Sequence, residues 1–164
     1  MTNQEGHDVM KVKEGDKPFD FEYQDSKGDK FSLSNVLKQK KIVIYFYPKD
    51  FTPGCSIEAE EFTRGYALFK QQGIEIIGIS PDSNDSHIKF REKMNIPYML
   101  ASDPNNEISK GYGVYGLKKF MGKEYYGVTR STFLVDQSGR IAKIYSSVKP
   151  RGHSKEVLEF FNKV

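Results

Sequence analysis

IVIYFYPKDFTPGCSIEAEEF, residues 42–62, holds the signals that decide the fold. Its first six residues form a continuous apolar and β-branched run, too short for a helix, which predicts a central strand buried on both faces. After the turn KDFTPG, apolar residues recur at spacings of three and four at Ala59, Phe62, Tyr66 and Phe69. This periodicity predicts an amphipathic helix that buries one stripe against a sheet.

The rest of the chain alternates strands and helices. Before the central strand we expect two short strands, in FDFEY and KFSL, around a Gly-containing turn, and then a serine-capped helix at 34–38. After the amphipathic helix we expect a strand at 74–80, a helix with Ile88, Phe90 and Met94, a strand at 97–101 and a brief helix. A Gly-rich loop up to Gly127, a hairpin of 131–136 and 141–147, and a closing helix with Val157 and Phe161 complete the chain. This order predicts an α/β, thioredoxin-like fold: a mixed central sheet with helices on both faces and an N-terminal β-hairpin extension.

Size and composition limit the possible classes of protein. A chain of 164 residues fits one domain, 1–164, and its polar start suggests a loose segment at 1–16. The net charge is +3 and the lysines are scattered, which argues against a nucleic-acid-binding groove. No stretch approaches the roughly 20 apolar residues of a membrane span, and the first residues lack the apolar core of a secretory signal. We therefore expect a cytoplasmic protein with no membrane or nucleic-acid partner.

The only cysteine, Cys55, lies at the start of the predicted helix. Thr52 is placed as the N-cap, Pro53 as the first helical residue and Cys55 as the third. Unpaired backbone N–H groups and the positive end of the helix dipole favour a thiolate at this position. A lone cysteine is often a small buried hydrophobe. Because this one follows the carboxyl end of a strand, we expect the sulfur at the sheet edge and not in the packed interior.

These residues resemble a known family. YFYPKDFTPGCSIEAEEF is similar to the signature of the peroxiredoxins, in particular their bacterioferritin-comigratory (Q-type) branch. The pattern P-x-x-x-T-x-x-C falls on Pro48, Thr52 and Cys55, and the acid that follows it in this branch falls on Glu58. The resemblance also covers VKEGDKPFDFE, IIGISPDSNDSHIKF and GVYGLKKFMGKEYYGVTRSTFLVD, and so spans nearly the whole chain.

The resemblance implies a role for each of these residues. Cys55 would attack a hydrogen peroxide or organic hydroperoxide and become a sulfenic acid. Thr52 would hydrogen-bond the peroxide, and Arg130 would stabilise the thiolate and polarise the O–O bond. Glu58 would hold the arginine, and Pro48 would shield the sulfur from water. Taken singly, Arg130 could be a surface residue, Glu58 a solvated helix position and Thr52 only a cap.

The sequence departs from many members of this branch because it has no second cysteine. The two positions at which the branch carries a resolving cysteine hold Glu60 and, by alignment, Arg91. The chain therefore resembles the one-cysteine members, whose sulfenic acid is resolved by an external thiol. The expected partners are a peroxide substrate and a reductant such as thioredoxin or glutaredoxin with glutathione. No other cofactor is expected, and the branch favours a monomer.

Two other functions compete with this interpretation. A thioredoxin-type disulfide reductase normally needs a nearby second cysteine, which is absent. A non-catalytic interaction or holdase module of the same fold would tolerate an inert cysteine. The histidines, at 7, 87 and 153, have no Cys or His neighbour at metal-ligand spacing and need no role, so no metal is expected. The aromatic residues of the Gly-rich loop would cover the core edge or wall a substrate pocket: Tyr112, Tyr115, Phe120, Tyr125 and Tyr126.

Overall fold

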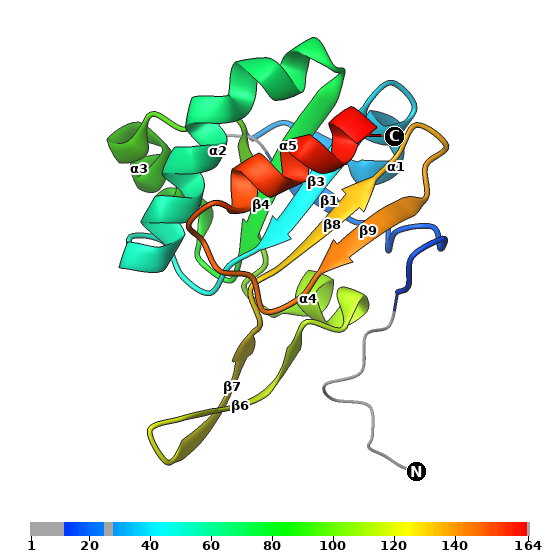
Figure 1. The fold of residues 1–164 in the computed structure, drawn as a ribbon. Coiled ribbons are helices and arrows are strands. Elements are labelled where there is room, and N and C mark those ends of the chain that lie inside the picture. Colours follow the sequence, from blue (N-terminus) through cyan, green and yellow to red (C-terminus); the bar gives the residue numbers. More distant parts are fainter. Residues whose placement is uncertain (1–11, 25–27, 164) are drawn as a thin grey trace.

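The computed structural model describes residues 12–24 and 28–163. Its elements, shown in Figure 1, are β1 (Glu22–Gln24), β2 (Lys30–Ser32), α1 (Leu33–Leu37), β3 (Lys41–Phe46), α2 (Pro53–Gln71), β4 (Ile74–Ser80), α3 (Asn84–Met94), β5 (Met99–Ser102), α4 (Glu107–Tyr112), β6 (Tyr115–Phe120), β7 (Lys123–Val128), β8 (Ser131–Val135), β9 (Ile141–Tyr145) and α5 (His153–Lys163). None of the helices in the described ranges is long and apolar enough to cross a membrane.

A five-stranded sheet in the order β5-β4-β3-β8-β9 forms the centre of the fold. β3 pairs in parallel with β4 and antiparallel with β8, and β9 pairs antiparallel with β8. The apolar run at 42–47 is completely buried, as its composition predicts. Because β3 lies in the middle of the sheet, the residues that follow it emerge at the centre of one sheet edge.

Alternation along β3 divides the core into two layers. Ile42, Ile44 and Phe46 face the layer that includes side chains from α1 and α4. Val43 and Tyr45 face the opposite layer, which includes side chains from α2, α3 and α5. Figure 1 shows α2 and α5 lying across one face of the sheet. The predicted mixed sheet with helices on both faces and an N-terminal hairpin, β1–β2, is therefore confirmed.

Residues 12–16, the described part of the segment expected to be loose at 1–16, are attached to the sheet. Val12 is buried in the first core layer. The Gly15 amide donates to the Ile141 carbonyl at 2.7 Å, and the Ile141 amide donates to the Asp16 carbonyl at 2.8 Å. Residues 1–11, including His7, lie outside the described residues. Hydrogen bonds to β9 thus fix a segment whose polar composition suggested no structure.

The predicted Gly-rich loop up to Gly127 is wrong, because most of it forms the antiparallel hairpin β6–β7. Met121 and Gly122 form its turn, and both have positive φ, 52° and 80°, as the tight hairpin turns of the primed types require. The hairpin projects from the body of the fold (Figure 1). A smaller correction concerns α1, which begins at Leu33 with Ser32 as its cap, one residue before the predicted helix.

Candidate active site

Cys55 occupies the predicted position in the first turn of α2. Thr52 is the N-cap and Pro53 the first helical residue. The first amides of a helix have no carbonyl partner within it, so they and the helix dipole favour negative charge on the sulfur. The expectation that the sulfur lies outside the packed interior is wrong, because Cys55 is 1% exposed and belongs to the second core layer. The fold thus combines a buried sulfur with a thiolate-stabilising helix end.

Arg130 reaches this sulfur from the neighbouring strand, since it immediately precedes β8, which pairs with β3. Its Nη2 lies 3.3 Å from Cys55 Sγ. The contact follows from strand register: Ser131, the first residue of β8, pairs with Phe46, the last residue of β3. Residues just before β8 therefore meet residues just after β3. A guanidinium at this distance stabilises a thiolate by charge and by hydrogen bonding.

Glu58, one turn after Cys55, holds the other side of the same guanidinium. Its Oε1 accepts a hydrogen bond from Arg130 Nη1 at 2.7 Å, whereas its Oε2 is buried with no partner. Burial raises the pKa of Glu58 to about 7, although the charge and hydrogen bonds of Arg130 act in the opposite direction. Burial lowers the pKa of Arg130, but Glu58 and Cys55 outweigh it and leave that pKa above its ordinary value. Arg130 is therefore a permanent cation shared between two acidic groups.

Gly54 allows the guanidinium to approach. A Cβ added at Gly54 would lie 3.1 Å from Arg130 Nη2 and 3.5 Å from Pro150 Cγ. The distance to Pro150 is an ordinary van der Waals contact, but the one to Arg130 is tight enough to displace the guanidinium by a few tenths of an ångström. The sequence identified Gly54 only as a turn residue, since nothing in TPGC indicates that an arginine and a proline from the other end of the chain pack against it.

The Thr52 hydroxyl does not cap the helix. It donates instead to the Lys49 carbonyl oxygen at 2.8 Å, so the predicted side-chain cap is wrong although the N-cap position is confirmed. With its proton used in this way, Thr52 Oγ1 presents only lone pairs to any other partner. Pro48, the other motif residue, is exposed and lines a surface pocket together with Arg130.

That pocket has a volume of about 520 Å³ and lies between the 48–49 segment and the base of the β6–β7 hairpin. The charged residues in its wall are all cationic: Lys49, Lys118 and Arg130. Its aromatic wall consists of Tyr115, Tyr125 and Tyr126, three of the residues that the sequence placed either at the core edge or in a substrate pocket. Tyr112 lies in the core instead. The pocket is thus cationic and aromatic, with Arg130 between it and the sulfur.

Comparison with known proteins identifies the family of this chain. Residues 15–144 match the AhpC/TSA family. The chain belongs to this family. Peroxiredoxin Bcp of Bacillus subtilis (strain 168) is 43% identical over 150 residues, 92% of this chain and 95% of the relative. A putative peroxiredoxin bcp of Helicobacter pylori (strain J99) is 38% identical over 151 residues, 92% and 99% of the two chains. The predicted Q-type peroxiredoxin membership is therefore confirmed.

Solved structures of the same branch also confirm the thioredoxin-like fold. A cysteine mutant of Xylella fastidiosa PrxQ superposes with a TM-score of 0.86 at 32% identity, covering 93% of this chain and 96% of that one. The bacterioferritin comigratory protein of Xanthomonas campestris, studied for its alkyl peroxide reduction activity, gives 0.81 at 33% identity, with 87% and 90% covered. This peroxiredoxin is accordingly a thiol peroxidase, an oxidoreductase that acts on peroxides with a thiol reductant.

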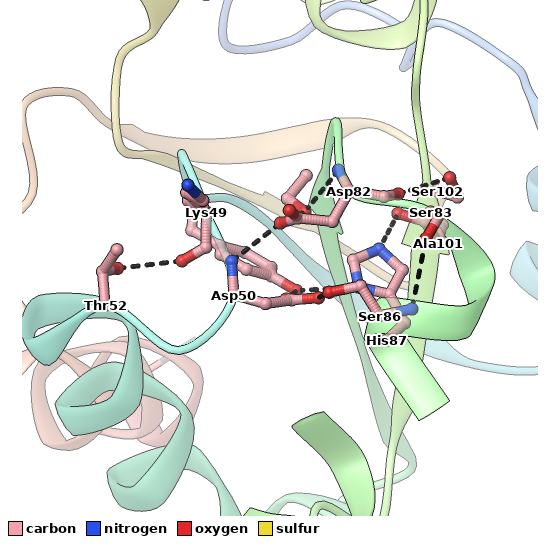
Figure 2. A network of polar contacts seen from close by, with 11 residues as sticks. Lys49, Asp50, Thr52, Asp82, Ser83, Ser86, His87, Ala101 and Ser102 are labelled. Atoms are coloured by element: carbon pink, nitrogen blue, oxygen red, sulfur yellow. Dashed lines mark hydrogen bonds and ion pairs between the residues drawn. The ribbon is translucent and has the colours of Figure 1, made fainter. Parts of the chain in front are cut away.

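A polar network that sequence reasoning missed lies next to the site (Figure 2). His87 and His153 were expected to need no role, but both are buried and hydrogen-bonded. Ligand-type atoms of Asp50, Asp82 and His87 all lie within 4.8 Å of one another, the one such group in the described ranges that could hold a metal ion. Each of these atoms also makes protein hydrogen bonds. The segments PKD (48–50) and SH (86–87) contain no local pattern that predicts this cluster, because only the tertiary fold brings them together.

Proposed function

We propose that this peroxiredoxin reduces hydrogen peroxide and organic hydroperoxides through a Cys55 sulfenic acid that an external thiol resolves. The observation that carries the proposal is the 3.3 Å contact between Arg130 Nη2 and Cys55 Sγ at the start of α2. A cation and a helix N-terminus that meet on one buried sulfur make a thiolate, which is the nucleophilic form of cysteine. An inert core cysteine needs neither.

The first step is a two-electron transfer from sulfur to peroxide. The Cys55 thiolate attacks the terminal oxygen of ROOH, the S–O bond forms and the O–O bond breaks, leaving Cys55–SOH and RO⁻. A proton from solvent converts RO⁻ to an alcohol, or to water when the substrate is hydrogen peroxide. Negative charge therefore moves from the sulfur to the departing oxygen during the reaction.

Each neighbouring group has a role in this step that its geometry supports. Arg130 touches the sulfur and is placed to stabilise charge as it shifts to the leaving oxygen. Thr52 Oγ1, whose own proton is donated to the Lys49 carbonyl, is placed to accept the hydroperoxide proton and so to orient the attacked oxygen. Glu58 fixes the guanidinium. Pro48 lines the pocket wall, and its role as a shield for the sulfur rests on the family resemblance.

The second half of the cycle needs two external thiols because the chain contains one cysteine. The first thiol attacks Cys55–SOH, forming a mixed disulfide and releasing water. The second attacks that disulfide, returning the Cys55 thiol and releasing an oxidised disulfide. Thioredoxin, or glutaredoxin with glutathione, would supply them. The monomeric state, the cytoplasmic location and the lack of any other cofactor stay predictions from the sequence.

The pocket supports the organic part of the substrate range. Its volume of about 520 Å³ exceeds the need of hydrogen peroxide, and its tyrosines offer apolar faces to an alkyl or aromatic group. The X. campestris relative, studied for its reduction of alkyl peroxides, favours the same class of substrate. We expect organic hydroperoxides to have lower KM values than hydrogen peroxide.

The proposal is tested by following peroxide consumption in a stopped-flow instrument and by trapping the oxidised cysteine. Wild type treated with one equivalent of peroxide and then dimedone should carry one adduct at Cys55, and Cys55→Ser should carry none and consume no peroxide. A reaction at the rate of a free thiol, with no adduct, would contradict the proposal and favour the holdase alternative. That alternative also predicts that Cys55→Ser retains full binding activity.

A further inference from the structure

Asp50 lies at the centre of a buried hydrogen-bond network between the 48–52 segment and α3 (Figure 2). Its Oδ1 accepts from the Tyr47 hydroxyl at 2.6 Å. Its Oδ2 accepts from the Ser86 hydroxyl at 2.8 Å and lies 2.7 Å from His87 Nδ1. Both carboxylate oxygens are therefore engaged, and they connect the segment before α2 to the first turn of α3.

The ring of His87 has an acceptor on each side. Nδ1 faces the Asp50 carboxylate, and Nε2 lies 3.1 Å from the Ala101 carbonyl oxygen. A carbonyl oxygen cannot donate, and the Asp50 carboxylate already accepts two hydroxyl protons. Nε2 therefore donates to the Ala101 carbonyl, and one further proton is shared between Nδ1 and Asp50 Oδ2, so both ring nitrogens are hydrogen-bonded. A buried pair with every hydrogen bond made holds its partners in one arrangement.

One peptide plane transmits this arrangement to the active site. The amide of Asp50 donates to Asp82 Oδ2 at 2.7 Å, and Asp82 Oδ2 also accepts from the Ser80 hydroxyl. The carbonyl of the same peptide, that of Lys49, accepts the Thr52 hydroxyl proton. Because a peptide is planar, fixing its N–H fixes the direction of its C=O. Asp82 thus sets the direction of the Lys49 carbonyl oxygen, and that oxygen in turn orients the Thr52 hydroxyl.

The segment also needs holding, because its backbone is strained. Phe51 has φ of 67°, in the left-handed region that is unfavourable for a non-glycine residue. Its ring packs against Phe90 of α3 at 5.1 Å between centroids. A segment with this conformation relaxes unless contacts on both sides of it are maintained. Asp50 and Phe51 both supply such contacts to α3, immediately before Thr52.

We propose that Asp82, Asp50 and His87 are positioning residues for peroxide reduction: together they hold the Lys49–Asp50 peptide so that the Thr52 hydroxyl presents its lone pairs to the bound hydroperoxide. None of them touches the sulfur or the substrate. The inference rests on the proposed function, since it assigns to the network the orientation of a peroxide-binding group. It accounts for a buried pair that the nucleophile itself does not need.

A divalent metal ion is the other occupant that this cluster could accept, because three ligand-type atoms lie close together. The hydrogen bonds favour the proton network. Asp82 Oδ2 already accepts two hydrogen bonds, and Asp50 Oδ2 contacts two donors. A metal ion could bind these oxygens only if the hydrogen-bond donors moved away from them. A stoichiometric metal in the purified protein would therefore overturn the inference.

The test compares two substitutions at one position. Asp82→Ala removes the acceptor for the Asp50 amide, and Asp82→Asn keeps a side-chain oxygen there. The rate constant for oxidation of Cys55 by peroxide should fall about 10-fold in Asp82→Ala and recover to within about twofold of wild type in Asp82→Asn, a loss smaller than that of a direct transition-state donor. Alkylation of Cys55 by iodoacetamide, which requires the thiolate but not Thr52, should change less than twofold in both.

A second pair of variants shows whether the effect passes through Thr52. Adding Asp82→Ala or His87→Gln to Thr52→Val should cause no further loss, because the group that the network orients is already gone. Multiplying losses, or parallel changes in peroxide and iodoacetamide rates, would mean a merely structural role and overturn the inference.

The same data separate this inference from the proposed function. If wild type shows no fast reaction with peroxide, the proposed function fails and the positioning role fails with it. If wild type is fast and Asp82→Ala is equally fast, only the positioning role fails.

Discussion

Two buried pairs, each of an acid and a basic side chain, lie at the start of α2, and they are built in opposite ways. Asp50, paired with His87, has both carboxylate oxygens hydrogen-bonded. Glu58, paired with Arg130, has one oxygen bonded and the other buried without a partner. The first pair is saturated and holds a segment in place. The second is incompletely satisfied and shares its cation with the reacting sulfur, which leaves that cation able to respond when the charge on the sulfur changes.

Replacing each acid by its amide should distinguish the two pairs most strongly. Asp50→Asn places an NH₂ group against donors and breaks the buried contact with His87, which should destabilise the fold by about 3 kcal/mol or more at pH 7. Urea unfolding followed by circular dichroism measures this loss. Glu58→Gln, the matched change, should cost much less at the same pH, because no second hydrogen bond is lost. Equal losses would show that the two pairs do not differ in kind.

Removing the shared cation should affect chemistry more than stability. Arg130→Met should lower the rate constant for peroxide by roughly 10²- to 10³-fold, the usual effect of deleting a group that stabilises transition-state charge. Arg64→Met, at an exposed arginine paired with Glu60 on the same helix, is the control and should react like wild type. A rate within threefold of wild type in Arg130→Met would remove Arg130 from the mechanism.

The unpartnered oxygen of Glu58 predicts a pH dependence of stability. Burial raises the pKa of Glu58 from 4.5 to about 7, so between these values the folded protein binds more protons than the unfolded chain. Stability from this group is then full below pH 4.5 and is lost as the pH rises to 7. The loss amounts to roughly 3 kcal/mol, since a tenfold change in proton affinity is worth about 1.4 kcal/mol.

Unfolding free energies of wild type and Glu58→Gln, measured from pH 4.5 to 8, isolate this contribution because all other groups are common to both. The difference should move in favour of the glutamine variant as the pH rises. A difference that stays constant would mean that Glu58 is ionised throughout, with Arg130 compensating its burial.

The smallest expected effect tests how closely Arg130 must approach the sulfur. Gly54→Ala adds a Cβ 3.1 Å from Arg130 Nη2, so the guanidinium must move by a few tenths of an ångström. Peroxide reactivity should fall about threefold, because small misplacements of a catalytic group are costly. The free energy of unfolding should rise slightly, since alanine is the better helix former. A loss of both reactivity and stability would point to a general clash instead.

The sequence predicted the parts of this site that lie close together in the chain. The strand, turn and helix around Cys55 follow from one apolar run and one Thr-Pro-Gly turn. Arg130 and Glu58 were assigned through family resemblance, because no local pattern connects residues 72 positions apart. The sequence missed the depth of burial of Cys55, since the packing of other elements over α2 decides it. It also missed the use of the Thr52 hydroxyl, which depends on one carbonyl direction.

The missed β6–β7 hairpin and the missed Asp50–His87 pair have different causes. The hairpin strands are mostly exposed or half-buried, so no alternation of apolar residues marks them. Their turn, Met121-Gly122, is a less obvious signal than Asn-Gly. From the sequence, His87 was interpreted as part of a polar helix start, because the acceptors on both sides of its ring come from other segments. Hydrogen bonds of this kind are tertiary, whereas periodicity reports only burial on one face.

The pairing of β8 with β3 also determines when, during synthesis of the chain, the active site is assembled. Cys55 leaves the ribosome 75 residues ahead of Arg130, and the guanidinium reaches the sulfur only when β8 docks beside β3. A nascent chain that ends before residue 130 carries a thiol without its cation. Until β8 pairs with β3, the start of α2 is the only one of the two thiolate-stabilising features available to the cysteine, so the complete site forms only when the sheet closes.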